Sequence, residues 1–309
     1  MMRLLSGLIV ALFAGSAAVA SDLWHEKYFP NVVLTDQDGV EHKFYDDLIK
    51  GRIVAISFIY TNCNEICPAD TAQLMQVKDM LKGRVGKDIF FFSISIDPDN
   101  DTPKVLKRYK EMFGIGPEWP FLTARNLEDV TLLQRKLGLI GKDKPILKEH
   151  NTSVIVGNEV TEQWIKRSPY DHPKLLVNLL GEQLRNFSGT TNAKLKPFSA
   201  ASENPNVSRG ELLFRSRCTA CHTIGGGDKL GPDLKGVVTS RDPAWLNRWL
   251  REPDKMIAEG EPLATALRAR YRNMPMPNFS LGDVEVDALI DYMKDPDKKP
   301  ETSAVTEMH

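Results

Sequence analysis

The hydrophobic pattern of the first 185 residues alternates between strands and helices. Two runs, 53–60 and 89–96, are almost continuously apolar, which is typical of strands buried on both faces of a sheet. Between them lies a helical pattern from Pro68, a residue suited to the first turn of a helix, to Leu81. A strand, a crossover helix and a second strand predict a parallel pair, with helices packed around a central sheet.

Shorter patterns extend this prediction. Asp38-Gly39 separates two short apolar stretches, so a hairpin is expected there. Further helices are predicted at 102–113, 127–137 and 173–185, and one more β pair at 154–156 with 161–165. The first region is therefore expected to fold as an α/β domain.

The pattern changes after a segment that is small, polar and without periodicity, as a linker should be. Helical patterns at 208–214 and 283–293 then enclose a second domain. The predicted organisation is a signal peptide at 1–20, an α/β domain at 21–186, a linker at 187–206, a second domain at 207–294 and a disordered tail at 295–309.

The N-terminal segment predicts export. Arg3 precedes an apolar run from Leu4 to Val19, and small residues then offer a cleavage site before Ser21. The alternative is an uncleaved membrane anchor, although the run is short for a span. With cleavage we expect a periplasmic protein without a membrane span. The near-balanced charge, 40 Lys and Arg against 41 Asp and Glu, argues against nucleic acid as a partner.

The four cysteines of the chain form two closely spaced pairs, and the second pair has the spacing of a c-type haem attachment site. Cys218 and Cys221 enclose two residues and are followed by His222. In such a site the two sulfurs form thioethers with the haem and the histidine ligates the iron. One covalent haem per chain is predicted. A zinc ribbon is excluded because no further cysteine pair follows, and a structural disulfide is the remaining alternative.

A haem that carries electrons is expected to have a methionine as its second axial ligand, because a thioether raises the reduction potential. Two candidates, Met274 and Met276, lie close together, and Met276 is preferred. For either residue the alternative is a packing role in the core. Trp245 and Trp249 are four residues apart and are expected to pack in the core or at the haem edge.

The other pair, Cys63 and Cys67, encloses three residues and lies where a buried strand meets a helix N-terminus. Helix amide groups and the macrodipole favour negative charge at this position and are expected to lower a thiol pKa. Two thiolates select Cu(I), and the same pair can close into a disulfide. The spacing alone is equally compatible with two buried, inert cysteines.

The first domain resembles the Sco/SenC copper chaperones of cytochrome oxidase assembly. The similarity covers roughly residues 32–180 and is strongest in Phe58-Ile59-Tyr60-Thr61-Asn62-Cys63, in Cys67-Pro68 and in the segment 94–103. It implies a thioredoxin-like fold and a copper site made by Cys63, Cys67 and a distant histidine, which matches His150. Asp97 matches an acidic residue near that site.

The second domain resembles class I cytochromes c in residues 245–250, in the segment Met276-Pro277-Asn278-Phe279-Ser280-Leu281 and in the helix after it. This resemblance implies an all-α domain. Together the resemblances predict a thioredoxin-like domain followed by a cytochrome c domain.

Three functions follow from this organisation. The preferred one is copper delivery to, or thiol reduction of, the copper-site subunit of a respiratory oxidase or another periplasmic redox protein, with the haem passing electrons to the copper–dithiol centre. Such a chain is a metallochaperone or electron-transfer protein more than a turnover enzyme. The alternatives are an electron carrier whose first domain only docks a partner, and a metal-free thiol–disulfide oxidoreductase that uses Cys63 and Cys67.

Overall fold

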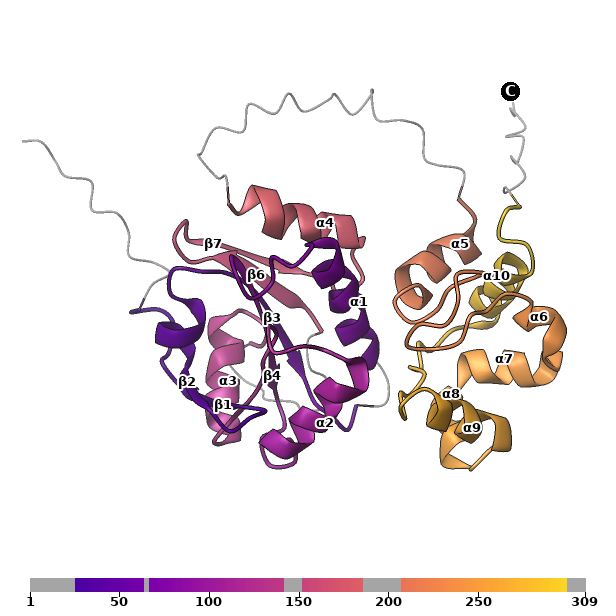
Figure 1. Cartoon of the computed structure of the whole chain (residues 1–309), viewed down its shortest axis with the longest axis horizontal. Coiled ribbons are helices and arrows are strands. Elements are labelled where there is room, and N and C mark those ends of the chain that lie inside the picture. Colours follow the sequence, from indigo (N-terminus) through magenta and orange to yellow (C-terminus); the bar gives the residue numbers. More distant parts are fainter. Residues whose placement is uncertain (1–25, 64–66, 142–151, 186–206, 299–309) are drawn as a thin grey trace, which may run out of the picture.

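The computed structural model describes residues 26–63, 67–141, 152–185 and 207–298. The predicted signal peptide and linker and His150 lie outside the described residues, as does the end of the predicted tail from residue 299. Figure 1 shows two folded regions, a sheet with helices and a smaller group of helices.

The first region is built on one seven-stranded sheet with the order β2-β1-β5-β4-β3-β6-β7. Its strands are β1 (Val33–Asp36), β2 (Glu41–Lys43), β3 (Ile53–Ile59), β4 (Ile89–Ser95), β5 (Phe121–Ala124), β6 (Val154–Asn158) and β7 (Gln163–Arg167). The predicted parallel pair is confirmed as β3 and β4, and the predicted hairpin as the antiparallel pair β1 and β2.

Strand β3 lies inside the sheet, between β4 and β6, and all seven of its residues are buried. Because side chains alternate along a strand, its apolar residues enter two different cores. Ile53, Ala55 and Ile59 pack on one face of the sheet. Val54 and Ile56 pack on the other. This double burial is what makes the apolar run continuous in the sequence.

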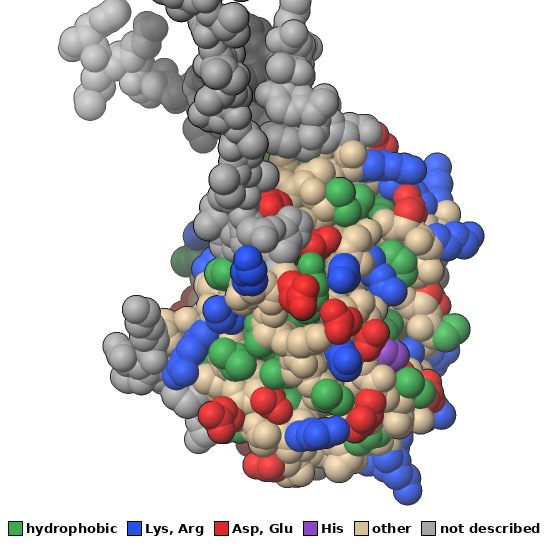
Figure 2. Space-filling model, turned by 90° about the vertical axis from the view of Figure 1, so that its left-hand side faces the viewer, with side chains coloured by type: hydrophobic (Ala, Val, Ile, Leu, Met, Phe, Trp, Pro, Cys, Tyr) green, Lys and Arg blue, Asp and Glu red, His purple; other side chains and the backbone are tan. Residues whose placement is uncertain are grey.

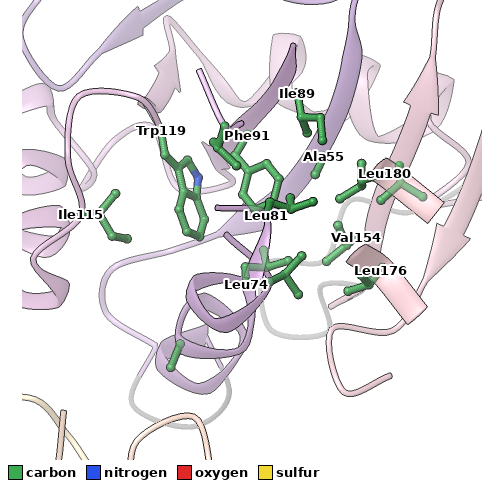
Figure 3. Packing of buried hydrophobic residues seen from close by; sticks show 14 of the residues in the cluster. Ala55, Leu74, Leu81, Ile89, Phe91, Ile115, Trp119, Val154, Leu176 and Leu180 are labelled. Carbon is green, nitrogen blue, oxygen red and sulfur yellow. The ribbon is translucent and has the colours of Figure 1, made fainter. Parts of the chain in front are cut away.

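Helices cover both faces of the sheet (Figure 1). One face carries α1 (Cys67–Met80), α2 (Pro103–Phe113) and α4 (Pro173–Asn178), and the other carries α3 (Leu127–Lys136) and a π-helical segment at Phe44–Ile49. Around Phe91 and Trp119 the first core is filled by side chains from α1, β3, β6 and α4 (Figure 3). The indole N–H of Trp119 donates to Ser93 Oγ at 3.0 Å, so the polar atom of this buried ring is satisfied.

Local sequence explains where these helices begin and end. Asn126 caps α3 by accepting a hydrogen bond from the Asp129 amide at 2.8 Å. Gly114 ends α2 with φ of 70°, a conformation that favours glycine. The predicted helix at 173–185 is α4 followed by a π-helical segment, Leu179–Gln183.

The second region is all-helical within its described residues, 207–298. Its helices are α5 (Arg209–Leu213), α6 (Val237–Ser240), α7 (Pro243–Arg251), α8 (Pro253–Ala258), α9 (Pro262–Arg270) and α10 (Asp283–Lys294). Helices α5 and α10 cross at Gly210, where an added Cβ would lie 1.9 Å from the carbonyl oxygen of Ala288. Only glycine permits the two backbones to approach this closely.

The surface of the first region turned away from the helical region mixes charges of both signs (Figure 2). Lys and Arg side chains are interspersed there with Asp and Glu, so this side shows no continuous basic patch. This agrees with the formal net charge of −1. Among the described residues, no helix combines the length and the apolar character needed to cross a bilayer.

A leucine pair tests the packing. Leu106 in α2 has 0% exposure and Leu132 in α3 has 38%. Leu106→Ala should lower the free energy of unfolding by about 2–5 kcal/mol, because it removes buried methyl groups and leaves a cavity. Leu132→Ala, the matched control, should change it by less than about 1 kcal/mol. Urea unfolding followed by circular dichroism measures both. Equal losses in the two variants would contradict the assigned core.

Candidate redox centres

The first centre lies at the carboxyl end of β3, where the chain passes through Cys63 and enters α1 at Cys67. The Cys67 amide donates a hydrogen bond to Cys63 Sγ at 3.3 Å, and the two cysteines are 4% and 0% exposed. The structure therefore brings the predicted pair together at the first turn of a helix. Two sulfurs in this arrangement can bind one soft metal ion or form a disulfide.

The expected lowering of the thiol pKa is wrong for Cys67. Its hydrogen bond with the Cys63 side chain and its burial raise the pKa of the Cys67 thiol far above the usual range. The helix terminus contributes at most about 1–2 kcal/mol, which cannot offset the removal of a thiolate from water. Without a metal, this thiol is protonated at neutral pH.

The acidic residue that contacts the cysteine loop is Asp101, which the sequence analysis did not single out. Its carboxylate accepts hydrogen bonds from the Thr61 amide, at 3.0 and 3.2 Å, and from the Thr61 hydroxyl. It also accepts one from Ser95 Oγ at 2.5 Å. Asp101 thus ties the loop after β3 to the end of β4. The predicted Asp97 instead accepts hydrogen bonds on both carboxylate oxygens from the side-chain Nδ2 of Asn100, each 2.9 Å long.

The third predicted copper ligand, His150, lies outside the described residues. Within the part of the chain that the structure describes, no group of three His, Cys, Asp or Glu side chains is placed to hold a metal ion. Cys63 and Cys67 are thus the two predicted ligands that the structure brings together, and the whole copper site, His150 included, stays a prediction.

The second centre is built on the turn that contains Cys218, Cys221 and His222. The His222 amide donates to the Cys218 carbonyl at 2.9 Å, and the Cys221 amide donates to the same oxygen at 3.1 Å. All three side chains of this helical turn line the same pocket. Burial raises the pKa of the Cys218 and Cys221 thiols to about 12.

The orientation of His222 is set by the segment that follows it. Its Nδ1 lies 2.8 Å from the carbonyl oxygen of Pro232, which leaves Nε2 for a ligand. Gly231 packs against the ring, because an added Cβ would lie 2.5 Å from His222 Cε1. Burial also lowers the pKa of His222, so the neutral imidazole that binds a metal is favoured.

The pocket beside this turn fits a haem. It is lined mainly by apolar side chains from α7, α9, α10 and the segment 274–277. Trp245 also lines it, and its indole is hydrogen-bonded to the Glu261 side chain, one of the contacts that lower the pKa of that carboxyl group. Trp249 stacks on Trp245 with ring centroids 5.3 Å apart, as expected for a packing pair.

The two candidate methionines both line the pocket but differ in their packing. Met276 packs against the apolar core of the second domain. Met274, which is 8% exposed, belongs instead to the buried cluster of the first domain. This placement favours Met276 as the distal ligand, and the assignment stays a prediction.

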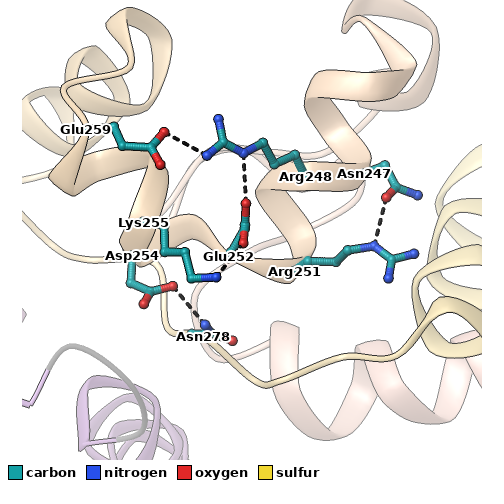
Figure 4. A network of polar contacts seen from close by, with 8 residues as sticks. All are labelled: Asn247, Arg248, Arg251, Glu252, Asp254, Lys255, Glu259 and Asn278. Carbon is teal, nitrogen blue, oxygen red and sulfur yellow. Dashed lines mark hydrogen bonds and ion pairs between the residues drawn. The ribbon is translucent and has the colours of Figure 1, made fainter.

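A polar network holds the segment that carries Met276 (Figure 4). Asn278 donates to Asp254 Oδ1 of α8 at 2.7 Å, and its own Oδ1 accepts from the Ser280 amide at 2.8 Å. An ion pair between Arg248 and Glu252, 2.9 Å long, links α7 to the start of α8. These contacts anchor the loop that follows Met276 to the helices of its own domain.

Two family models match separate parts of the chain. The model described as SCO1/SenC matches residues 25–118, and the model described as cytochrome c matches residues 207–296. The SCO1 protein homolog of Bacillus subtilis (strain 168) is 31% identical, over 33% of this chain and 64% of its own length. The chain spans less than two thirds of the length of the curated relatives it matches.

Solved structures match each part as well. ScoI of Arabidopsis thaliana with copper bound is 20% identical, over 50% of this chain and 97% of that chain, with a TM-score of 0.42. The cytochrome c domain of the pp3183 protein from Pseudomonas putida is 49% identical, over 28% of this chain and 84% of that chain, with a TM-score of 0.26.

Gly231→Ala tests the pocket geometry. The new methyl group would press on the His222 ring and displace it, so the visible spectrum of the haem-loaded protein should lose its low-spin form in part or whole. Gly282→Ala is the matched control, because its Cβ would meet only Glu285 Oε2 at 3.9 Å. Absorption spectra of the reduced proteins compare the two. An unchanged spectrum in Gly231→Ala would contradict the contact with His222.

Proposed function

We propose that this chain is a copper–dithiol redox protein with its own electron supply. It joins a thioredoxin-like SCO1/SenC domain to a cytochrome c domain, and the cofactors of the two domains are copper and one covalent c-type haem. Its task is to prepare copper for, or reduce the thiols of, the copper-site subunit of a respiratory oxidase. The periplasm is the proposed compartment, in keeping with the predicted signal peptide.

The observation that carries this proposal is the contact between the two cysteines at the start of α1. The Cys67 amide donates to Cys63 Sγ at 3.3 Å and the two thiols are hydrogen-bonded to each other, so both sulfurs lie within reach of one ion. In the proposed site they bind Cu(I) as thiolates, and the His150 imidazole completes the coordination and allows Cu(II) to be held. Cys218, Cys221, His222 and Met276 hold the haem.

Held by Cys218, Cys221, His222 and Met276, the haem would supply one-electron chemistry, with Cu(II) at the dithiol as the acceptor and a one-electron donor protein outside the chain as the source. The chain's own residues hold the two metals and exclude water from them. Burial of Cys63 and Cys67 favours the singly charged ion over the doubly charged one. Reduction of one Cu(II) ion takes one electron, which is what one haem supplies. This match supports copper as the electron acceptor.

A second candidate is a thiol–disulfide oxidoreductase, which the raised pKa of Cys67 favours. A protonated, buried thiol is the expected product of disulfide reduction. That reaction consumes two electrons and two protons for each disulfide, so one haem has to donate twice, and be re-reduced twice, for each disulfide reduced. In this function His150→Ala leaves activity intact, whereas replacing either cysteine abolishes it.

Copper binding tests the first centre. The parent should bind one copper per chain, and Cys63→Ser or Cys67→Ser should reduce Cu(I) affinity steeply because a thiolate is lost. His150→Ala should retain Cu(I) binding and weaken Cu(II) binding. Competition with a chromophoric chelator measures all four proteins. Parent-like Cu(II) affinity in His150→Ala would mean that another residue is the third ligand.

The pH dependence of copper binding follows from the raised pKa of Cys67. A protonated thiol has to lose its proton when copper binds, so Cu(I) affinity should rise with pH across the neutral range. Each proton released adds about a tenfold gain per pH unit. Chelator competition at several pH values measures the slope. A flat profile would indicate that the thiol is already ionised.

The distal ligand is tested by two methionine variants of a protein carrying one covalent haem. Met276→Ala should abolish the methionine–iron charge-transfer band and lower the reduction potential, because a thioether ligand raises it. Met274→Ala is the matched control and should keep the band. Absorption spectra and potentiometric titration measure both effects. Loss of the band in Met274→Ala alone would reverse the assignment.

A further inference from the structure

The two domains meet through a partly buried hydrogen bond. Gln73 in α1 is 2% exposed, and its Nε2 donates to the carbonyl oxygen of Ser216 at 2.5 Å. Ser216 lies two residues before Cys218, in the π-helical segment Phe214–Cys218. The helix that begins at Cys67 is therefore in direct contact with the segment that carries the haem-binding cysteines. Figure 1 shows α1 on the side of the first domain that faces the second.

An aromatic contact lies beside this hydrogen bond. Tyr170 of the first domain meets Phe279 of the second edge-on, with ring centroids 6.3 Å apart. The Arg217 guanidinium lies 5.8 Å from the centroid of the same Phe279 ring. Arg217 directly precedes Cys218, and Phe279 follows Met276 by three residues. The contact thus uses residues that flank both predicted axial sides of the haem pocket.

Tyr170 also connects this contact to the dithiol. Burial and then the charge of the neighbouring Asp70 raise the pKa of Tyr170. Asp70 is 4% exposed and lies one helical turn after Cys67. A chain of neighbouring side chains therefore leads from the first turn of α1, through Asp70 and Tyr170, to Phe279 beside the haem pocket.

Apolar packing completes the interface. Two residues of the second domain, Ala220 and Met274, belong to the same buried cluster as the core residues of α1 and α2, and the partly buried Cys221 and Leu230 pack against that cluster. Cys221 is one of the two haem-attachment cysteines. The attachment edge of the pocket is accordingly covered by the first domain.

We propose that this contact is the docking site of an internal redox partnership, in which the second domain sits with its Cys218–Cys221 segment on α1 and exchanges electrons with the dithiol centre. The inference rests on the proposed function for its redox part. It adds the residues that form the dock, Gln73 and Tyr170 on one side and Ser216, Arg217 and Phe279 on the other. In the docked arrangement, the edge of the haem pocket that carries Cys218 and Cys221 faces the dithiol domain of the same chain.

The test uses the full-length, haem-loaded protein. The double variant Gln73→Ala/Tyr170→Ala removes the hydrogen bond and the ring contact. The equilibrium constant for docking should fall about tenfold or more, which corresponds to roughly 1.4 kcal/mol. Small-angle X-ray scattering should report a larger radius of gyration. In stopped-flow mixing, oxidation of ferrous haem by Cu(II) bound to the same molecule should slow by the same factor as the docked fraction falls, since only docked molecules react promptly.

Matched controls guard against loss of folding. Tyr28→Ala removes a half-buried tyrosine from the other face of the sheet and should leave scattering and rate unchanged. Arg217→Glu tests the contact from the side of the second domain. Arg209→Glu is its control, because it makes the same change of charge at an exposed position of α5. Only Arg217→Glu should reproduce the expansion and the slower rate. Circular dichroism checks that each variant is folded.

Three results would overturn the inference, and they are distinguishable. An extended parent by scattering would mean that the dock does not form in solution. Expansion of the double variant with an unchanged rate would mean that the dock is not the route of the electron, while the proposed function stands. No haem oxidation in a compact parent would overturn the proposed function and the redox role together, although scattering would still report the dock.

Discussion

The arrangement of the first centre depends on the complete burial of β3. Because all seven of its residues are buried, this strand needs a neighbour on each edge and a core on each face, and it lies between β4 and β6. The chain then has to leave the sheet at a fixed point, and Cys63 and Cys67 follow at that exit. The Asp101 carboxylate fixes the exit further, because it joins Thr61 of the loop to Ser95 of the neighbouring strand.

The same burial sets the chemistry of the dithiol. A thiol enclosed by protein is costly to ionise, so Cys67 is favoured as a neutral thiol until a cation compensates its charge. The haem centre is organised on a similar basis. Burial keeps His222 neutral, and the Pro232 carbonyl fixes which nitrogen faces the pocket. In both centres the protein supplies a dry, shaped space, and the metal supplies the charge.

Much of the fold could be predicted because its strongest signals are local. The continuous apolar runs gave β3 and β4, and the Asp38-Gly39 turn gave the first hairpin. Strand β5 was missed because it has only four residues and follows directly on Trp119-Pro120. Helices α8 and α9 were missed as well, since each is short and begins at a proline after a brief turn.

The residues of the two centres also differ in how far the sequence alone could predict their roles. Cys218, Cys221 and His222 are fixed by spacing alone, and the structure places them on one turn. Asp97 and Asp101 occur in one segment, and the sequence cannot tell which of them contacts Thr61, forty residues away. The direction of the Cys67 pKa was wrong for a related reason. A helix terminus can be recognised in a sequence, but the burial that outweighs it is a property of the folded chain.

The close crossing of α5 and α10 at Gly210 also bears on how such a chain can arise. Because the first and last helices of the cytochrome domain touch backbone to backbone, the two ends of that domain are held by its own interior. A unit closed in this way needs only a single connection to a neighbour, since its fold does not depend on what is attached. Joining an electron carrier to a copper-handling domain then requires no redesign of either core, and only the few side chains at their shared boundary need to adapt.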